Sequence, residues 1–279
     1  MTESTRQHAL GPEHLAGCQA LSAAAGWNQN EADWRLMLEI GHGWGRSLAD
    51  GTLIATTLVL PYGTFAWISM VLVHAAHRRR GHASRLLRIA IADLRARGLT
   101  PLLDATPAGR EVYRREGFHD TWTFKRYQLK SGTEPDFHSR LDDRRMAAVT
   151  NFDSLAGLDR EAFGADRTLL LRALQRRMPQ AALASADGFV LAREGREAHQ
   201  IGPLVTRDAQ TARALLEEAL RVVPAPVYVD VVDHAPALQQ WVQAQGFVLQ
   251  RPFTRMVHRG GRAPGNEQLV YLVAGPELG

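Results

Sequence analysis

The sequence predicts an α/β protein made of two tandem domains that share one folding plan. The chain has 279 residues, which exceeds a usual single domain and favours two domains of about 100 to 150 residues each. Patterns typical of helices, strands and turns follow one another in the same order in both halves. A polar stretch at residues 130–136 separates the two runs and is typical of a linker. We therefore place the domains at residues 1–132 and 137–279.

The first half begins with two predicted helices and a predicted hairpin. Residues 13–24 and 30–40 carry apolar side chains at helical spacing, and the second stretch opens with an asparagine and two acidic residues, as a capped helix does. Residues 52–60 and 65–73 are apolar and β-branched, with turn residues between them. That alternation of strand and turn signals predicts an antiparallel hairpin.

A helix, a strand and a second helix complete the first half. From Gly81 onward, apolar residues recur at the i, i+3, i+4, i+7 positions of one helix face. Residues 101–105 form a short apolar strand. Thr106 and Pro107 then begin a helix as cap and first residue, and Gly117 ends it.

The second half repeats this order. It has predicted helices at residues 153–163 and 167–178, strands at 189–193 and 199–205, a helix at 208–222, a strand at 227–232 and a helix at 236–245. Each half also contains a Gly-Phe pair that is followed, at equal spacing, by a phenylalanine and an arginine. These residues are Gly117, Phe118, Phe124 and Arg126 in the first half and Gly246, Phe247, Phe253 and Arg255 in the second. The match indicates duplication of a whole domain, since a solenoid would have a far shorter period.

Composition excludes several classes of protein. Apolar residues make up 45% of the chain and charged residues 22%, as in ordinary soluble globular proteins. Residues 1–17 resemble neither a signal peptide nor an anchor, and no apolar run has the length of a membrane span. Cys18 is the only cysteine, which excludes an internal disulfide and a cysteine-based metal cluster. We expect a cytoplasmic protein without a metal site.

The positive charge raises the question of a nucleic-acid partner. The net charge is +4, and the densest basic run occupies residues 77–80. This run directly precedes a helix, where a phosphate site would need it, while the other arginines are spread through both halves. We therefore expect no nucleic-acid partner.

The most informative segment covers residues 71–84, VLVHAAHRRRGHAS. A predicted strand ends at Val73, a basic loop follows, and a helix opens at Gly81. The backbone N–H groups of the first helical turn lack partners within the helix, and the helix dipole adds positive charge there. Gly81 and Ala83 leave room for a pyrophosphate to reach this backbone. Arginine-rich loops also cap or solvate helices, so this segment alone leaves both roles open.

A second segment, residues 103–118 (LDATPAGREVYRREGF), combines a strand, a capped helix and a Tyr-x-x-x-Gly-Phe ending. Together the two segments resemble motifs A and B of the GNAT superfamily of N-acetyltransferases, over about residues 12–130. The first matches the Arg/Gln-x-x-Gly-x-Gly/Ala loop and the second the tyrosine-bearing helix. The resemblance implies a mixed sheet, acetyl-CoA as co-substrate and direct attack on its thioester by a primary amine, carried by a small molecule or a peptide.

The resemblance also implies a cofactor site. The strand at residues 65–73 would splay from its neighbour, so that the backbone of Val71, Leu72 and Val73 pairs with the pantetheine arm and polarises the thioester carbonyl. The residues that would hold the pyrophosphate are Arg78, Arg79, Arg80, Gly81, His82, Ala83 and Ser84. Thr106 stands where many relatives have an asparagine that contacts the cofactor.

Tyr113 would be the catalytic acid that protonates the departing CoA thiolate. A phenol has a pKa of about 10, so it is protonated at neutral pH. The structural alternative is a helix tyrosine packed beside Phe118. The general base is unassigned, because Trp67 and Ser69 occupy the strand positions where some relatives carry glutamate or histidine. Asp104 and His74 are candidates, each of them also explained as a structural polar group, and a water relay would suffice.

The second half departs from the family pattern. Aligning the helices without gaps sets Gln210 against Gly81, brings Asp208 to the phosphate position and sets Val242 against Tyr113. We therefore expect a degenerate domain that neither binds CoA well nor catalyses. A non-catalytic protein that senses acyl-CoA or another metabolite is the alternative for the whole chain. Trp27, Trp34 and Trp44 are each candidates for the acceptor site or for the core.

Overall fold

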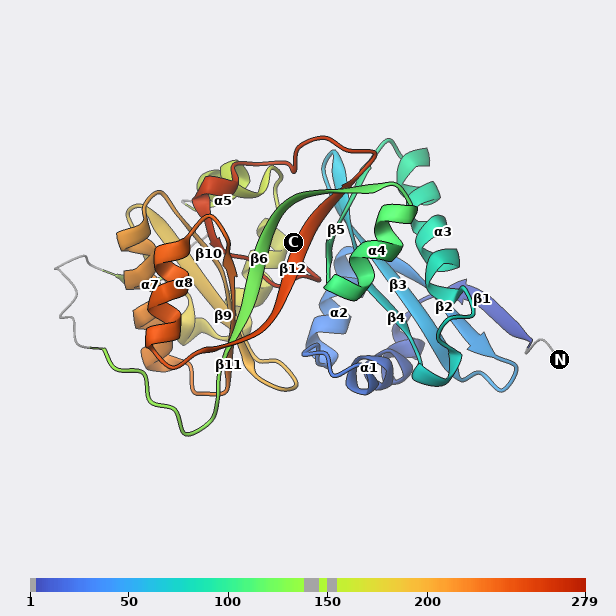
Figure 1. The fold of residues 1–279 in the computed structure, drawn as a ribbon, viewed down its shortest axis with the longest axis horizontal. Coiled ribbons are helices and arrows are strands. Elements are labelled where there is room, and N and C mark those ends of the chain that lie inside the picture. The colour runs from blue at the N-terminus through green and yellow to red at the C-terminus, as the bar shows by residue number, and fades with distance from the viewer. Residues whose placement is uncertain (1–3, 138–145, 150–154) are drawn as a thin grey trace.

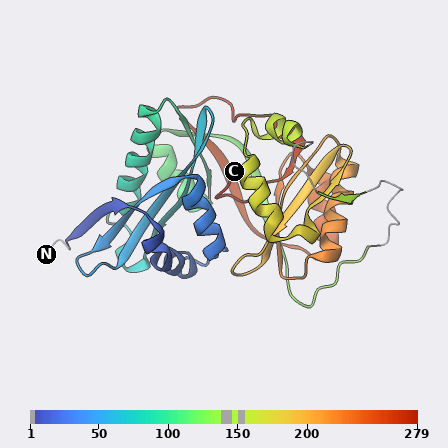
Figure 2. The ribbon, with the colours of Figure 1, turned by 180° about the vertical axis from the view of Figure 1, so that it is seen from behind.

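In the computed structural model, described here for residues 4–137, 146–149 and 155–279, one mixed sheet runs through both halves of the chain (Figure 1). Helices cover both of its faces, as the views from the front and from behind show (Figures 1 and 2). The α/β class predicted from the sequence is therefore confirmed. No helix within the described ranges is long and apolar enough to cross a bilayer.

The first half contains the predicted elements together with three strands that the sequence patterns did not reveal. Its elements are β1 (Thr5–Ala9), α1 (Leu15–Ala24), α2 (Glu31–Ile40), β2 (His42–Leu48), β3 (Leu53–Tyr62), β4 (Phe65–Val73), α3 (His82–Ala96), β5 (Thr100–Ala105), α4 (Pro107–Arg115) and β6 (Phe118–Leu129). The added strands are β1, β2 and β6. Asn30 caps α2 through a reciprocal pair of 3.0 Å hydrogen bonds with Asp33.

The hairpin turn lies later than predicted. Pro61 and Tyr62, expected in the turn, belong to β3 and pair with Ala66 and Phe65 of β4. The reason is burial, because the Tyr62 side chain is only 4% exposed and its hydroxyl donates to the Leu278 carbonyl at 3.0 Å. The strand therefore continues until this side chain has reached the core.

The second half, where the structure describes it, repeats the order of elements of the first half and adds one short strand, β13, at its end. Its elements are β7 (Ala147–Ala148), α5 (Ala156–Phe163), α6 (Thr168–Arg177), β8 (Leu183–Ser185), β9 (Gly188–Arg193), β10 (His199–Thr206), α7 (Ala209–Val222), β11 (Val227–Val232), α8 (Pro236–Ala244), β12 (Val248–His258) and β13 (Val270–Leu272). The predicted order is confirmed. The first two residues of the helix predicted at 153–163 lie outside the described residues.

The two halves exchange their last long strands. The order in the sheet is β1-β2-β3-β4-β5-β12-β6-β11-β13-β10-β9-β8-β7. Strand β12 of the second half therefore lies between β5 and β6, and β6 of the first half lies between β12 and β11, at the centre of Figure 1. The sheet is therefore not divided at the polar stretch of residues 130–136. Each half completes the sheet of the other.

Reciprocal ion pairs join the exchanged strands. Arg126 of β6 binds Asp230 of β11 with two hydrogen bonds of 2.8 and 2.7 Å. Arg255 of β12 binds Asp104 of β5 in the same way, at 3.0 and 2.9 Å. All four side chains are at most 7% exposed. Because a buried charge without its partner is costly, these pairs specify which strands may lie side by side.

The repeated Phe and Arg positions of the two halves meet at this exchange. Phe124 and Phe253 lie directly opposite each other on β6 and β12, with ring centroids 5.0 Å apart and ring planes 11° apart. Arg126 and Arg255 follow at the same spacing in each half. The equal spacing seen in the sequence thus reflects a crossing in which each half contributes the same residues.

Candidate functional site

A splay between β4 and β5 opens the sheet in the first half. The two strands pair in parallel only from Phe65 to Trp67. Beyond this point β4 contains a bulge, with Met70 at a φ of 50° and its carbonyl accepting a 2.8 Å hydrogen bond from the Thr56 hydroxyl. Among the described residues, the backbone after this bulge, including Val71, pairs with no strand on its β5 side. The splay expected from the sequence is confirmed.

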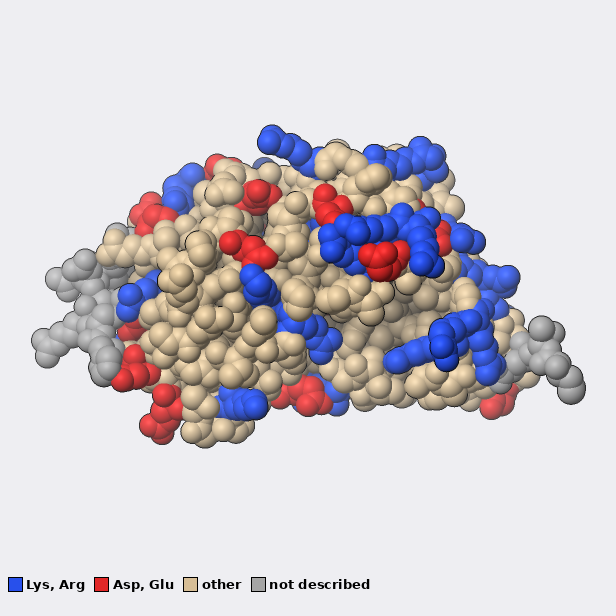
Figure 3. Space-filling model, viewed as in Figure 1, with Lys and Arg blue, Asp and Glu red and all other residues tan. Residues whose placement is uncertain are grey.

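The basic loop after β4 ends at an uncapped helix N-terminus. Gly81 precedes α3 with a φ of 78°, a left-handed conformation that favours glycine, and no side chain of the described residues caps this helix. Arg78, Arg79 and Arg80 are exposed beside it. Figure 3 shows Arg and Lys side chains gathered over the first half of the molecule. Free N–H groups and positive charge at a helix N-terminus suit an anion.

A groove joins the splay to this helix terminus. It contains every residue predicted to hold the cofactor except Arg80, namely Val71, Leu72, Val73, Arg78, Arg79, Gly81, His82, Ala83, Ser84 and Thr106. Arg80 instead lines a second hollow, together with Arg46, Arg85 and Arg88. We call the first of these hollows the β4–α3 groove.

Tyr113 stands at the inner end of the groove. Helix α4 holds it there, and the Thr106 hydroxyl caps that helix as predicted, accepting the Gly109 N–H at 3.2 Å. The Tyr113 ring is half-buried, 6.1 Å from the Phe118 ring between centroids, and burial raises its pKa to about 12. A Cβ at Gly109 would lie 2.9 Å from the tyrosine ring, so glycine makes room for it.

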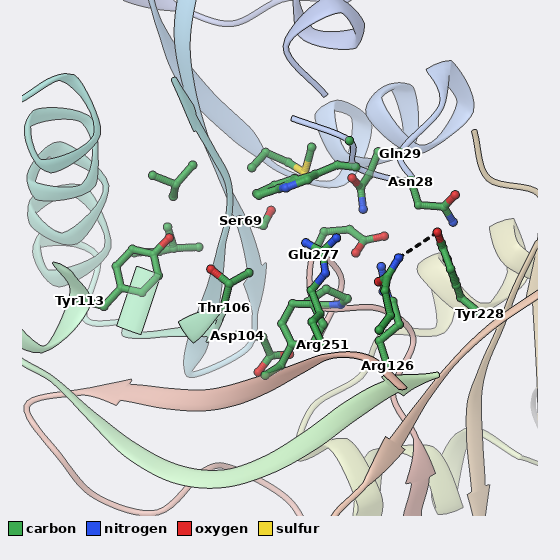
Figure 4. A pocket seen from close by; sticks show the side chains of 18 residues that line it. Asn28, Gln29, Ser69, Asp104, Thr106, Tyr113, Arg126, Tyr228, Arg251 and Glu277 are labelled. Atoms are coloured by element: carbon green, nitrogen blue, oxygen red, sulfur yellow. Dashed lines mark hydrogen bonds between the residues drawn. The ribbon is translucent and has the colours of Figure 1, made fainter. Parts of the chain in front are cut away.

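A third hollow, the central pocket, begins where the β4–α3 groove ends. Its walls are residues 26–29, β4, β5 and α4 on one side and β6, β11, β12 and residues 276–277 on the other. The groove and the pocket share four lining residues, which are Trp27, Val71, Thr106 and Tyr113. Figure 4 shows Tyr113 at one end of the pocket and Tyr228 at the other, with Glu277 and Arg251 between them. Both halves of the chain therefore build the pocket.

Neither base candidate from the sequence combines a place in the central pocket with an unpaired side chain. Asp104 lines the central pocket, but both of its oxygens accept hydrogen bonds from Arg255. Burial raises the pKa of Asp104, while the attraction of Arg255 opposes that rise. His74 lines a different hollow, beside Gly51 and Leu53. Sequence reasoning missed the carboxylate that remains, Glu277.

Glu277 comes from the end of the chain and lies deep in the pocket wall. Its side chain is 3% exposed, and its Oε1 accepts a hydrogen bond from Arg193. Among the residues that the structure describes, its Oε2 has no hydrogen-bond partner. The neighbouring backbone is fixed to β4, because the Trp67 indole donates to the Pro276 carbonyl at 3.0 Å. The chain end thus brings a carboxylate with one unpaired oxygen into the lining of the pocket.

Of the three tryptophans considered, only Trp27 lines the groove and the pocket. Trp34 is fully buried and donates to the Ser22 hydroxyl at 2.9 Å. Trp44 packs against the apolar side chains under α3. Trp34 and Trp44 are therefore core residues.

The corresponding helix of the second half has its N-terminus filled by its own side chain. Asp208 accepts the Thr211 N–H at 2.8 Å and the Thr211 hydroxyl at 2.7 Å. The carboxylate takes the position that an anion would take at α3. Val242, which aligns with Tyr113, is fully buried.

Comparison with known proteins agrees with this duplication. Residues 15–118 match the "Acetyltransferase (GNAT) family", and residues 155–272 match an "Acetyltransferase (GNAT) domain". No curated protein matches the chain.

Solved structures share the arrangement of the whole chain. A putative acetyltransferase from Pyrococcus horikoshii is 21% identical, with a TM-score of 0.84 over 100% of this chain and 97% of that one. A GCN5-related N-acetyltransferase from Sphaerobacter thermophilus is 16% identical, with a TM-score of 0.65 over 94% and 97%. A tandem GNAT protein from the clavulanic acid biosynthesis pathway is 15% identical, with a TM-score of 0.64 over 92% and 99%. At these identities the likeness is one of fold.

Proposed function

Because the chain belongs to the GNAT acetyltransferase superfamily, with one GNAT domain in each half, we propose that it transfers the acetyl group of acetyl-CoA to a primary amine. The observation that supports this proposal is that a groove with arginines and an uncapped helix N-terminus, running along a splayed strand, meets the central pocket at Tyr113. The groove suits a long polyanionic donor and the pocket a small acceptor. The acetyl group would be transferred where the groove and the pocket meet.

In this proposal acetyl-CoA lies along the β4–α3 groove. The N–H groups at the start of α3 and the arginines of the preceding loop bind the pyrophosphate. The pantetheine arm follows the unpaired edge of β4 past Val73 and Leu72. The thioester then reaches Val71, next to the Tyr113 hydroxyl.

The amine attacks from the central pocket. Its nitrogen forms a bond to the thioester carbon as the bond from that carbon to sulfur breaks. Tyr113 gives its proton to the departing sulfur, a role for which a pKa of about 12 keeps the phenol protonated. Glu277 takes the proton lost by the amine through its unpaired oxygen, directly or through one water. Exchange with solvent restores both groups.

The second half serves the reaction by completing the acceptor pocket. Tyr228, Arg251 and Glu277 all come from it and line that pocket. We propose no cofactor site in this half, because Asp208 occupies the helix terminus and Val242 replaces the tyrosine.

Release of thiol from acetyl-CoA in the presence of a panel of primary amines tests the proposal. We expect amine-dependent thiol release and an acetylated product of matching mass. Tight acetyl-CoA binding without thiol release for any amine would favour a non-catalytic sensor instead.

A further inference from the structure

Most charged side chains of the central pocket are neutralised within the protein. Asp104 and Arg126 belong to the two ion pairs that join the halves. Glu277 belongs to a largely buried cluster with Asp33, Arg177 and Arg193, in which Arg177 also binds the half-exposed Glu194. Each charged side chain of these groups therefore has an oppositely charged partner within the protein.

Arg251 of β12 is different. It is half-buried, lines the pocket and lies directly opposite Arg126 of β6 in the sheet register. Within the described ranges, no hydrogen bond or ion pair reaches its guanidinium group. Partial burial, and then the positive charge of Arg126, lower the pKa of Arg251. Like charges placed opposite each other destabilise a sheet, so packing alone gives no reason for an arginine here.

The same pocket presents hydrogen-bond acceptors that lack donors. Buried atoms without a partner among the described residues include Gln29 Oε1, Ser69 Oγ, Gln250 Oε1 and Glu277 Oε2, all on pocket-lining residues. The amide nitrogen of Gln250 donates to the Tyr228 hydroxyl at 3.0 Å, which leaves its oxygen directed elsewhere (dashed line in Figure 4). A buried polar atom left unpaired costs about 1–3 kcal/mol. A ligand rich in N–H groups would satisfy these atoms.

We propose that the acceptor is an amine that also carries a carboxylate, as an amino acid does. The carboxylate pairs with Arg251, and the amino group donates to Glu277 and the neighbouring acceptors. This inference rests on the proposed function and names its substrate class.

The charge balance supports this class over simple amines. At the moment of attack the amine is neutral, so an amino acid carries one negative charge, which complements the Arg251 guanidinium. An amine without an acid group leaves Arg251 half-buried and unpaired. Arginine binds carboxylates through two parallel hydrogen bonds, which adds orientation to affinity.

Matched pairs of acceptors test the proposal. Leucine is compared with isoamylamine and phenylalanine with phenethylamine, so that each pair differs only in the carboxylate. We expect kcat/KM to be about 10- to 100-fold higher for the amino acid of each pair, the usual strength of a hydrogen-bonded ion pair. A preference for the plain amines would overturn the proposal. So would a preference for phosphoethanolamine over every amino acid tested, since it would replace the carboxylate by a phosphate.

Variants assign the preference to Arg251. Arg251→Gln should bring the ratio within each pair close to one, mainly through a higher KM for the amino acid, and Arg251→Lys should keep part of it. Arg262→Gln removes an equal charge at an exposed position outside the pocket and should leave the ratio unchanged. If Arg251→Gln preserves the full ratio, the carboxylate binds elsewhere and the proposal is wrong.

Binding measurements separate this inference from the proposed function. Calorimetry of each pair with the CoA-loaded protein repeats the comparison without turnover. Tighter binding of the amino acids that is lost in Arg251→Gln supports the substrate class even if no acetyl group is transferred. Equal binding within the pairs, or no binding of any amino acid, contradicts it even if acetyl-CoA binds well.

Discussion

Tyr113 lies where the β4–α3 groove of the first half meets the central pocket that both halves build, because it lines both hollows. Its burial raises the phenol pKa to about 12, so the group stays protonated throughout the neutral range. An acid this weak gives up its proton only to a strong base. The sulfur of the thioester becomes basic enough to accept this proton only as its bond to carbon breaks and negative charge collects on it.

Replacing Tyr113 with phenylalanine should therefore lower kcat with little change in acetyl-CoA affinity. General acid catalysis contributes about 10² to 10⁴ in rate, and the lower value is expected here because a thiol is itself moderately acidic. The ring stays in place beside Phe118 and preserves the packing. Steady-state kinetics and calorimetry together measure both quantities. Full kcat in this variant would reduce Tyr113 to a packing residue.

The structural positions that the sequence predicted correctly belong to local patterns. Gly81 before α3, Thr106 as the cap of α4 and Tyr113 on α4 all follow from spacing within a single segment. Arg251 and Glu277 gave no such signal. Both reach the pocket only through strand exchange and the return of the chain end, contacts that connect segments far apart in sequence.

At the scale of elements, the helices and strands that were predicted are likewise those with a strong local pattern. Helices with an apolar face and strands flanked by turns were recognised, including β4 and α3 at their observed positions. Strands β6 and β12 were missed, because part of each strand faces solvent and its alternation is weak. Their only sequence signal was the shared spacing of Phe and Arg residues. That spacing was interpreted as domain duplication, and the strand exchange behind it was not predicted.

The reciprocal ion pairs should make the exchanged strands essential for stability. Arg255→Met leaves the Asp104 carboxylate buried without its partner, which should lower the free energy of unfolding by about 3–5 kcal/mol. Adding Asp104→Leu should recover most of that loss, because a well-packed apolar pair replaces the ions. Urea denaturation measures both.

The exposed pair Arg160 and Asp166 provides the control, with side chains 60% and 59% exposed. Arg160→Met should cost at most about 1 kcal/mol. If Arg255→Met costs no more than Arg160→Met, the buried pairs do not hold the strand exchange together.

At the scale of the whole molecule, the two halves share one fold but contribute different parts of the proposed site. The first half carries the groove, the uncapped helix and Tyr113. The second half fills its own helix terminus with Asp208 and contributes walls to the pocket of the first. In the proposed function, the second half therefore has no cofactor site of its own, while its strands and chain end complete the acceptor pocket.

Calorimetric titration of the full chain with acetyl-CoA tests this division most directly. We expect one site per chain, weakened at least about tenfold by Gly81→Glu, which brings bulk and negative charge to the N-terminus of α3. The left-handed conformation should cost this variant only about 1–2 kcal/mol of stability. Gln210→Glu, at the aligned exposed position on α7, should leave the affinity unchanged. Two equivalent sites per chain, or unchanged affinity in a folded Gly81→Glu variant, would contradict a single cofactor site at the N-terminus of α3.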